Sequence, residues 1–145
     1  MSDSDTNFTA SVLTGNWSYR SLNNDPDLTV SFNDLEFGQG TIRIDPAPMD
    51  TLTGRIFGPG WGLDLTGSIG WGNPYSLNFQ GKGIVSGNEW IYAYQAYYVP
   101  RWPNGVNQVP ALVGSVVRVI PHPGGDGGLH PAGVVASFYA VRQND

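Results

Sequence analysis

Eight segments with the residue preferences of β-strands follow one another along this chain, and no stretch between them has the periodicity of an amphipathic helix. They cover residues 15–20, 35–45, 52–57, 62–71, 75–85, 89–99, 111–120 and 132–142. Most are separated by short stretches rich in Gly, Pro, Asn and Asp, which favour turns. Eight strands are the number at which a closed barrel is just wide enough to be filled by side chains or to hold one small ligand. We therefore predict an all-β protein, an eight-stranded antiparallel up-and-down β-barrel.

The two ends of this strand region carry a matched pair of side chains. Gly15 and Trp17 open the first segment, and Arg142 ends the last one. In a closed barrel these segments are neighbours, so the indole can fill one end while the guanidinium lies over it and binds backbone carbonyls of the first strand. We predict that Trp17 and Arg142 meet where the barrel closes.

A Gly-x-Trp on a first strand answered by a basic residue on the last strand resembles the calycin group of barrels, which includes lipocalins, fatty-acid-binding proteins and avidins. Residues 13–17 (LTGNW), 68–71 (SIGW) and 112–114 (LVG) are most similar to avidins. The resemblance implies an interior cavity for a small molecule. Where avidins place polar residues that bind biotin, this chain has Tyr19 and Val116, so we do not expect biotin as the ligand.

The 145 residues suit one domain, and we assign residues 1–12 to a flexible N-terminal segment and 13–145 to the barrel. The polar, acidic start lacks the basic and apolar regions of a secretion signal, so we expect a cytoplasmic protein. There is no cysteine, which excludes a disulfide framework and thiolate catalysis.

Charge and hydropathy exclude two kinds of partner. The net charge is −5 and the seven Lys and Arg residues are scattered, so we expect no nucleic-acid partner. No apolar run approaches the ~20 residues of a membrane-spanning helix, and we expect no membrane partner.

Side-chain alternation along each strand predicts which residues line the interior. Starting from Trp17, it turns Tyr19 inward; on 89–99 either face is compatible, and we choose the face with more aromatic residues. A solid aromatic core is the alternative to a cavity. The predicted ligand-contacting residues are Tyr19, Leu65, Trp71, Phe79, Trp90, Tyr92, Tyr94 and Phe138.

The strands at 89–99, 111–120 and 132–142 carry apolar residues on both faces, whereas a wall with one solvated side alternates. We expect a second copy of the chain to cover the outer face of this wall, giving a homodimer or homotetramer.

Catalytic signals are sparse. There is no Gly-x-Ser-x-Gly turn, and the carboxylates have no paired spacing typical of glycosidases. His122 and His130, with Asp126 between them, would supply metal ligands, but each precedes a proline in a glycine-rich loop, and we expect solvated loop histidines. We predict no metal and no cofactor.

Tyr94 and Arg118 are the candidates for a catalytic role. If Arg118 points inward among its valine neighbours, it needs a partner, either an acidic residue or an anionic ligand group, and an ion pair at a subunit interface meets that need equally well.

Three functions are compatible with these patterns. The first is binding of a small apolar or aromatic molecule inside the barrel. The second is a cofactor-independent cyclase or isomerase that uses a shaped aromatic cavity. The third is carbohydrate binding by Trp61 and Trp102, which we expect on exposed loops.

Overall fold

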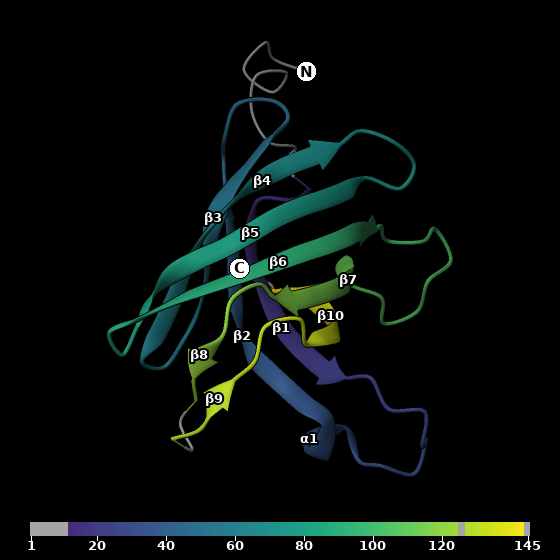
Figure 1. Cartoon of the computed structure of the whole chain (residues 1–145). Coiled ribbons are helices and arrows are strands. Elements are labelled where there is room, and N and C mark those ends of the chain that lie inside the picture. The colour runs from purple at the N-terminus through teal and green to yellow at the C-terminus, as the bar shows by residue number, and fades with distance from the viewer. Residues whose placement is uncertain (1–11, 125–126, 144–145) are drawn as a thin grey trace.

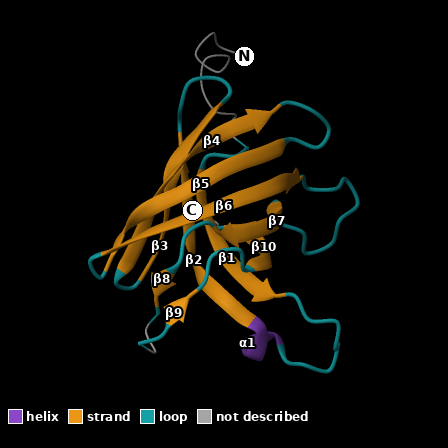
Figure 2. Ribbon diagram, in the orientation of Figure 1, coloured by secondary structure: helices purple, strands orange, loops and turns teal. Residues whose placement is uncertain are grey.

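The protein forms a closed barrel of antiparallel strands, seen in a computed structural model that describes residues 12–124 and 127–143 (Figure 1). Its elements are β1 (Gly15–Asn23), α1 (Phe32–Leu35), β2 (Glu36–Asp45), β3 (Thr51–Gly58), β4 (Trp61–Gly70), β5 (Ser76–Val85), β6 (Asn88–Val99), β7 (Ala111–Arg118), β8 (His122–Pro123), β9 (Leu129–His130) and β10 (Val135–Arg142). The barrel order is β1-β10-β7-β6-β5-β4-β3-β2, with β2 pairing back to β1. This confirms the predicted eight-stranded barrel, and Figure 2 shows how little of the chain is helical.

The barrel closes where β1 meets β10. Trp17 pairs with Arg142 across the two strands, and the guanidinium carbon of Arg142 lies 5.7 Å from the centroid of the indole ring. Trp17 is fully buried and its Nε1 donates to the carbonyl of Leu13 at 3.0 Å. Arg142 Nη1 donates to the carbonyl of Val12 at 2.7 Å, just before β1. The predicted closure is confirmed, and we call this end of the barrel the Trp17 end.

Side chains alternate between core and surface along the strands, as a barrel wall requires. Ala136, Phe138 and Ala140 are buried on β10, and Tyr92 and Tyr94 are buried on β6. The face of residues 89–99 with more aromatic residues therefore points inward, as predicted.

Two connections differ from the expected loops. Residues 28–30 form turns that lead into α1, and Ser31 caps this helix because its Oγ accepts a hydrogen bond from the backbone N–H of Asn33. The glycine-rich stretch 121–131 contains a two-stranded ladder in which His122 pairs with His130. Of the segment 1–12, only Val12 is among the described residues.

The outer face of β6, β7 and β10 carries apolar side chains. Tyr97, Val135 and Tyr139 are exposed there, and Val113 and Val117 are half-buried. A dimer or tetramer would cover this face, and it stays a prediction. Among the described residues, no helix has the length and apolar character needed to cross a membrane.

Candidate functional site

A pocket occupies the barrel end opposite Trp17. The β3–β4 and β5–β6 hairpins and the β1–β2 and β7–β10 connections gather at this end, because antiparallel strands alternate in direction around the barrel. The cavity has a volume of about 230 Å³ and is lined by Tyr19, Ser21, Phe37, Gly38, Gln39, Ile56, Trp61, Leu63, Trp90, Tyr92 and Tyr94. None of these lining side chains is charged.

The floor of the pocket is a packed group of aromatic rings. Tyr94 stacks on Phe79 with ring centroids 4.8 Å apart and planes 11° from parallel. Phe138 meets Tyr94 edge-on at 5.8 Å and lies 5.4 Å from the ring of Tyr19. All four residues are buried, so the floor is fixed by ring packing rather than by a flexible loop.

Two polar groups of the pocket have no protein partner among the described residues. The Trp90 indole Nε1 is buried and makes no hydrogen bond. Tyr94 is only 4% exposed, and its hydroxyl makes no hydrogen bond with any described residue. Burial raises the pKa of Tyr94 well above its ordinary value, so the hydroxyl keeps its hydrogen. The Tyr94 hydroxyl is therefore the donor that the pocket offers to a hydrogen-bonding atom of a ligand, whereas the Trp90 Nε1 has no accessible surface.

The Tyr19 and Ser21 side chains form a second polar patch on β1. Burial raises the pKa of Tyr19, and the hydrogen bond with Ser21 offsets part of that rise. Ser21 is fully buried and its Oγ donates to the carbonyl of Gly38 at 3.3 Å, which ties β1 to the pocket wall on β2.

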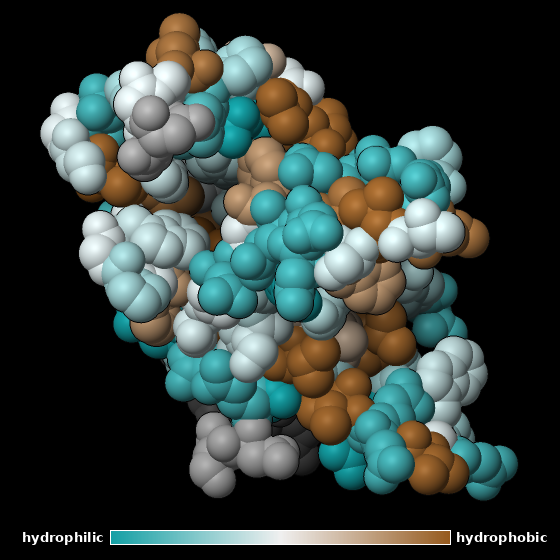
Figure 3. Space-filling view, turned by 90° about the horizontal axis from the view of Figure 1, so that it is seen from below, coloured by the Kyte–Doolittle hydropathy of each residue, from teal (hydrophilic) through white to brown (hydrophobic). Residues whose placement is uncertain are grey.

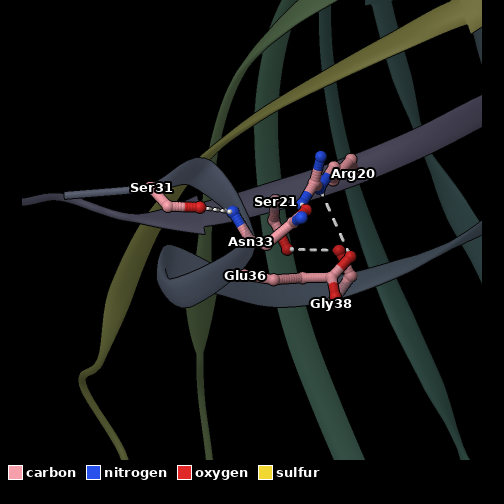
Figure 4. A network of polar contacts seen from close by, with 6 residues as sticks. All are labelled: Arg20, Ser21, Ser31, Asn33, Glu36 and Gly38. Carbon is pink, nitrogen blue, oxygen red and sulfur yellow. Dashed lines mark hydrogen bonds and ion pairs between the residues drawn. The ribbon is translucent and has the colours of Figure 1, made fainter.

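The start of β2 is held in place by a polar network (Figure 4). Arg20 Nη2 donates to Asn33 Oδ1 at 2.6 Å, and Arg20 Nε lies 3.3 Å from a carboxylate oxygen of Glu36. The β1–β2 register shifts here, since Ser21 faces Gly38 while Leu22 faces Glu36, and Phe37 is left unpaired. Such a bulge redirects a side chain, and Phe37 lies in the pocket wall.

Beside the pocket, Tyr92 on β6 lies between Arg118 on β7 and His122 on β8. The Tyr92 hydroxyl is 3.0 Å from Arg118 Nε and 2.7 Å from His122 Nε2. Arg118 Nη1 donates to the carbonyl of Pro131 at 3.2 Å, and the guanidinium carbon lies 5.0 Å from the Phe37 ring centroid. Arg118 is 7% exposed, and no ion pair within residues 12–124 and 127–143 includes it.

His122 is buried, in contrast to the solvated loop histidine that the sequence suggested. It is 3% exposed, and its ring stacks on Trp90 at 4.0 Å between centroids. Its Nδ1 lies 2.9 Å from the carbonyl of Pro123. Desolvation, reinforced by the electrostatic effects of Arg118 and His130, lowers the pKa of His122, so its imidazole is neutral near pH 7.

No group of three or more metal-ligating side chains comes together in the described part of the chain. Asp126, the third member of the metal alternative, lies outside the described residues. The described side chains bring hydroxyl, indole, imidazole and guanidinium groups to the site.

The structure brings most of the predicted ligand-contacting residues together. Tyr19, Trp90, Tyr92 and Tyr94 line the pocket. Leu65, Phe79 and Phe138 are buried in the core beneath it. Trp71 does not lie there: it follows β4 at the Trp17 end, is 44% exposed, hydrogen-bonds through its indole to Asp50 and packs against Tyr75.

Several pocket residues were missed by the sequence analysis. Trp61, expected on an exposed loop, is the first residue of β4 and lines the pocket, whereas Trp102 is exposed in the β6–β7 connection at the Trp17 end. Phe37 depends on a bulge that alternation does not anticipate. The place of His122 in the sequence gave one indication, because the long connection between the strands at 111–120 and 132–142 has to cross the mouth of the barrel.

A shallower depression of about 390 Å³ lies at the Trp17 end, lined by Val12, Gly72, Asn73, Pro74, Tyr75, Tyr98 and Pro100. Most of these residues are exposed.

The surface seen from below Figure 1 has apolar and hydrophilic residues interspersed (Figure 3). The pocket floored by Tyr94 combines buried walls with unpaired polar groups, and we take it as the candidate site.

Comparisons with protein-family models, with curated protein sequences and with solved structures find no match to this chain. The functional argument accordingly rests on the geometry of the site.

Proposed function

We propose that the pocket binds a compact, uncharged aromatic or apolar molecule that carries a hydrogen-bonding oxygen. Apolar cavities of about 150 Å³ accommodate a single benzene ring. A volume of about 230 Å³ therefore suits one ring with substituents or a small fused ring. The rings of Trp61 and Trp90 in the wall and of Tyr94 in the floor favour a flat ligand.

The observation that carries this proposal is the Tyr94 hydroxyl, which makes no hydrogen bond with a described residue and lies in an uncharged, largely aromatic pocket. A buried donor without a partner costs about 1–3 kcal/mol. A ligand oxygen that accepts from the Tyr94 hydroxyl would remove that cost. The absence of charge from the lining residues favours a neutral ligand, because an ion would lose its hydration without gaining a counter-charge.

The test is a titration of the protein with 2-indanone, a flat aromatic ketone, and with indane, which has the same rings without the oxygen. Chemical-shift changes of the indole N–H signals report binding at Trp61 and Trp90. Gly38→Leu places an apolar side chain at the pocket wall; a Cβ at this position meets only Ser21 Oγ, at 3.5 Å, so the backbone accommodates it. Gln95→Leu adds the same side chain to the exposed outer face of β6 and is the matched control.

We expect 2-indanone to bind the native protein and Gln95→Leu equally, and Gly38→Leu at least tenfold more weakly. Binding that Gly38→Leu leaves unchanged would place the ligand elsewhere and refute the proposal.

A further inference from the structure

Three buried side chains from three elements meet at one atom beside the pocket. Tyr92 lines the pocket, and its hydroxyl contacts Arg118 Nε at 3.0 Å and His122 Nε2 at 2.7 Å. Binding of a neutral molecule does not require a guanidinium and an imidazole on the same phenol.

The direction of each hydrogen bond in this group follows from its chemistry. Arg118 Nε can only donate, so the Tyr92 oxygen accepts there. The carbonyl of Pro123 can only accept, so His122 carries its hydrogen on Nδ1. The Nε2 of the neutral imidazole then accepts, and Tyr92 donates its hydroxyl hydrogen to it. Tyr92 thus points its hydrogen at a base while a positive charge lies against its oxygen.

We propose that Tyr92 exchanges a proton with the bound molecule, that His122 holds the displaced hydroxyl proton, and that the pocket thereby catalyses the enolisation and isomerisation of a small carbonyl compound. This inference rests on the proposed function, because the substrate must first occupy the pocket.

The proposed step conserves atoms and electrons within the site. The Tyr92 hydroxyl proton moves to His122 Nε2, and Arg118 stabilises the phenolate left behind. The phenolate takes a proton from the carbon next to the ligand carbonyl. The electron pair of the broken C–H bond forms the C=C bond of an enolate, and the carbonyl π electrons move to its oxygen.

In this step the Tyr94 hydroxyl donates a hydrogen bond to that oxygen. Tyr92 and Tyr94 are two residues apart on β6 and share the inner face, about 7 Å apart along the strand. Return of the proton from Tyr92 to the same carbon gives back the ketone, and return to a conjugated carbon gives an isomer. His122 then returns its proton to Tyr92, and no oxidant, reductant or cofactor is consumed.

The charges around this group set the energy of the proposed proton transfer. Burial raises the pKa of Tyr92, and the hydrogen bond and positive charge of Arg118 oppose that rise. Arg118 and His130 both face His122, the latter at 5.8 Å between ring centroids, and disfavour its protonation in the resting state. The proton on His122 becomes favourable only when a negative charge forms on Tyr92 or on the ligand.

The test follows hydrogen–deuterium exchange at the carbons next to the carbonyl of 2-indanone, by proton NMR in D₂O. Tyr92→Phe removes the hydroxyl, and His122→Gln keeps a hydrogen-bond acceptor near Tyr92 but cannot take up a proton. Tyr97→Phe removes an exposed hydroxyl from the outer face of the same strand and is the matched control. Affinity for 2-indanone is measured for each variant, together with its circular dichroism spectrum.

We expect native protein and Tyr97→Phe to accelerate exchange, and Tyr92→Phe to lose about 10²- to 10⁴-fold of the rate, the usual contribution of a positioned acid or base. Affinity should change less than about threefold, since the ring stays. The exchange rate with native protein should fall as pH drops through the titration of His122. This decrease at low pH should be missing from the pH profile of His122→Gln.

Two results separate failure of this inference from failure of the proposed function. Tight binding of 2-indanone with exchange that Tyr92→Phe leaves unchanged would overturn the catalytic role and keep the binding pocket. No binding of 2-indanone would overturn both. If Tyr92→Phe does not fold, exchange and its pH profile in His122→Gln decide the question in the same way.

Discussion

Replacing Tyr94 by Phe should move stability and affinity in opposite directions. The hydroxyl makes no hydrogen bond with a described residue, and the buried ring stacks on Phe79 at 4.8 Å. Phe keeps the ring stacking and removes only the unpaired hydroxyl. A buried unpaired hydroxyl costs about 1–3 kcal/mol, and because this one faces a pocket that water can enter, we take the lower end of that range.

The free energy of unfolding without ligand should therefore rise by about 1 kcal/mol. For a chain of this length, that corresponds to about 3 °C in Tm. Affinity for 2-indanone should fall about two- to tenfold through the loss of one neutral hydrogen bond, while affinity for indane should not change. Urea unfolding with and without ligand measures both quantities on one sample.

Tyr97→Phe serves as the control, because that hydroxyl lies on the outer face of β6 and should affect neither quantity. A drop in the stability of Tyr94→Phe would show that the hydroxyl has a protein partner. An equal loss of affinity for indane and 2-indanone would show that the ring, not the oxygen, is recognised.

The remaining predictions concern pH, the closure of the barrel and assembly. Burial lowers the pKa of His122 below its ordinary 6.5, so the contribution of the neutral imidazole to stability is present above pH 6.5 and is lost as pH falls through the pKa of the folded state. His122→Gln should therefore flatten the pH dependence of the free energy of unfolding below pH 6.5. Burial raises the pKa of Tyr19 above 10.0, so its contribution is present below pH 10 and is lost at higher pH, and alkaline unfolding monitored by tyrosinate absorbance should begin only above that pH. Arg142→Met should lower the free energy of unfolding by about 1–3 kcal/mol in urea titrations, since it removes the hydrogen bond to the Val12 carbonyl and the cation–π contact with Trp17. If a second copy covers the outer face, sedimentation velocity should show a dimer or tetramer that Tyr97→Lys dissociates; a native monomer would contradict that expectation.

The sequence predicted the barrel because its signals are local and agree with one another. Turn residues divide the chain at regular intervals, and alternation from Trp17 and Arg142 assigns inner faces that the burial of Ala136 and Phe138 confirms. Most differences lie at strand ends, where pairing partners rather than the strand's own residues decide where the ladder stops: β7 ends at Arg118 rather than residue 120.

The candidate site was only partly predictable for a different reason. Alternation assigns residues such as Tyr92 and Tyr94 to the inner face of the barrel but does not give their position along the barrel axis. Residues that line the pocket and residues of the packed core therefore have the same sequence pattern. Phe37 enters the pocket through a register shift, and His122 reaches Tyr92 through a connection whose path depends on the pairing of β8 with β9. Contacts of this kind depend on three elements at once and have no signature in any one segment.

The most direct test of the binding pocket is a crystal structure of the protein soaked with 2-indanone. We predict ligand density between Trp61 and Trp90, with the ketone oxygen within hydrogen-bonding distance of the Tyr94 hydroxyl. Density confined to the depression beside Tyr75 and Tyr98, or a pocket filled by side chains that leave no room for a ring, would contradict the account.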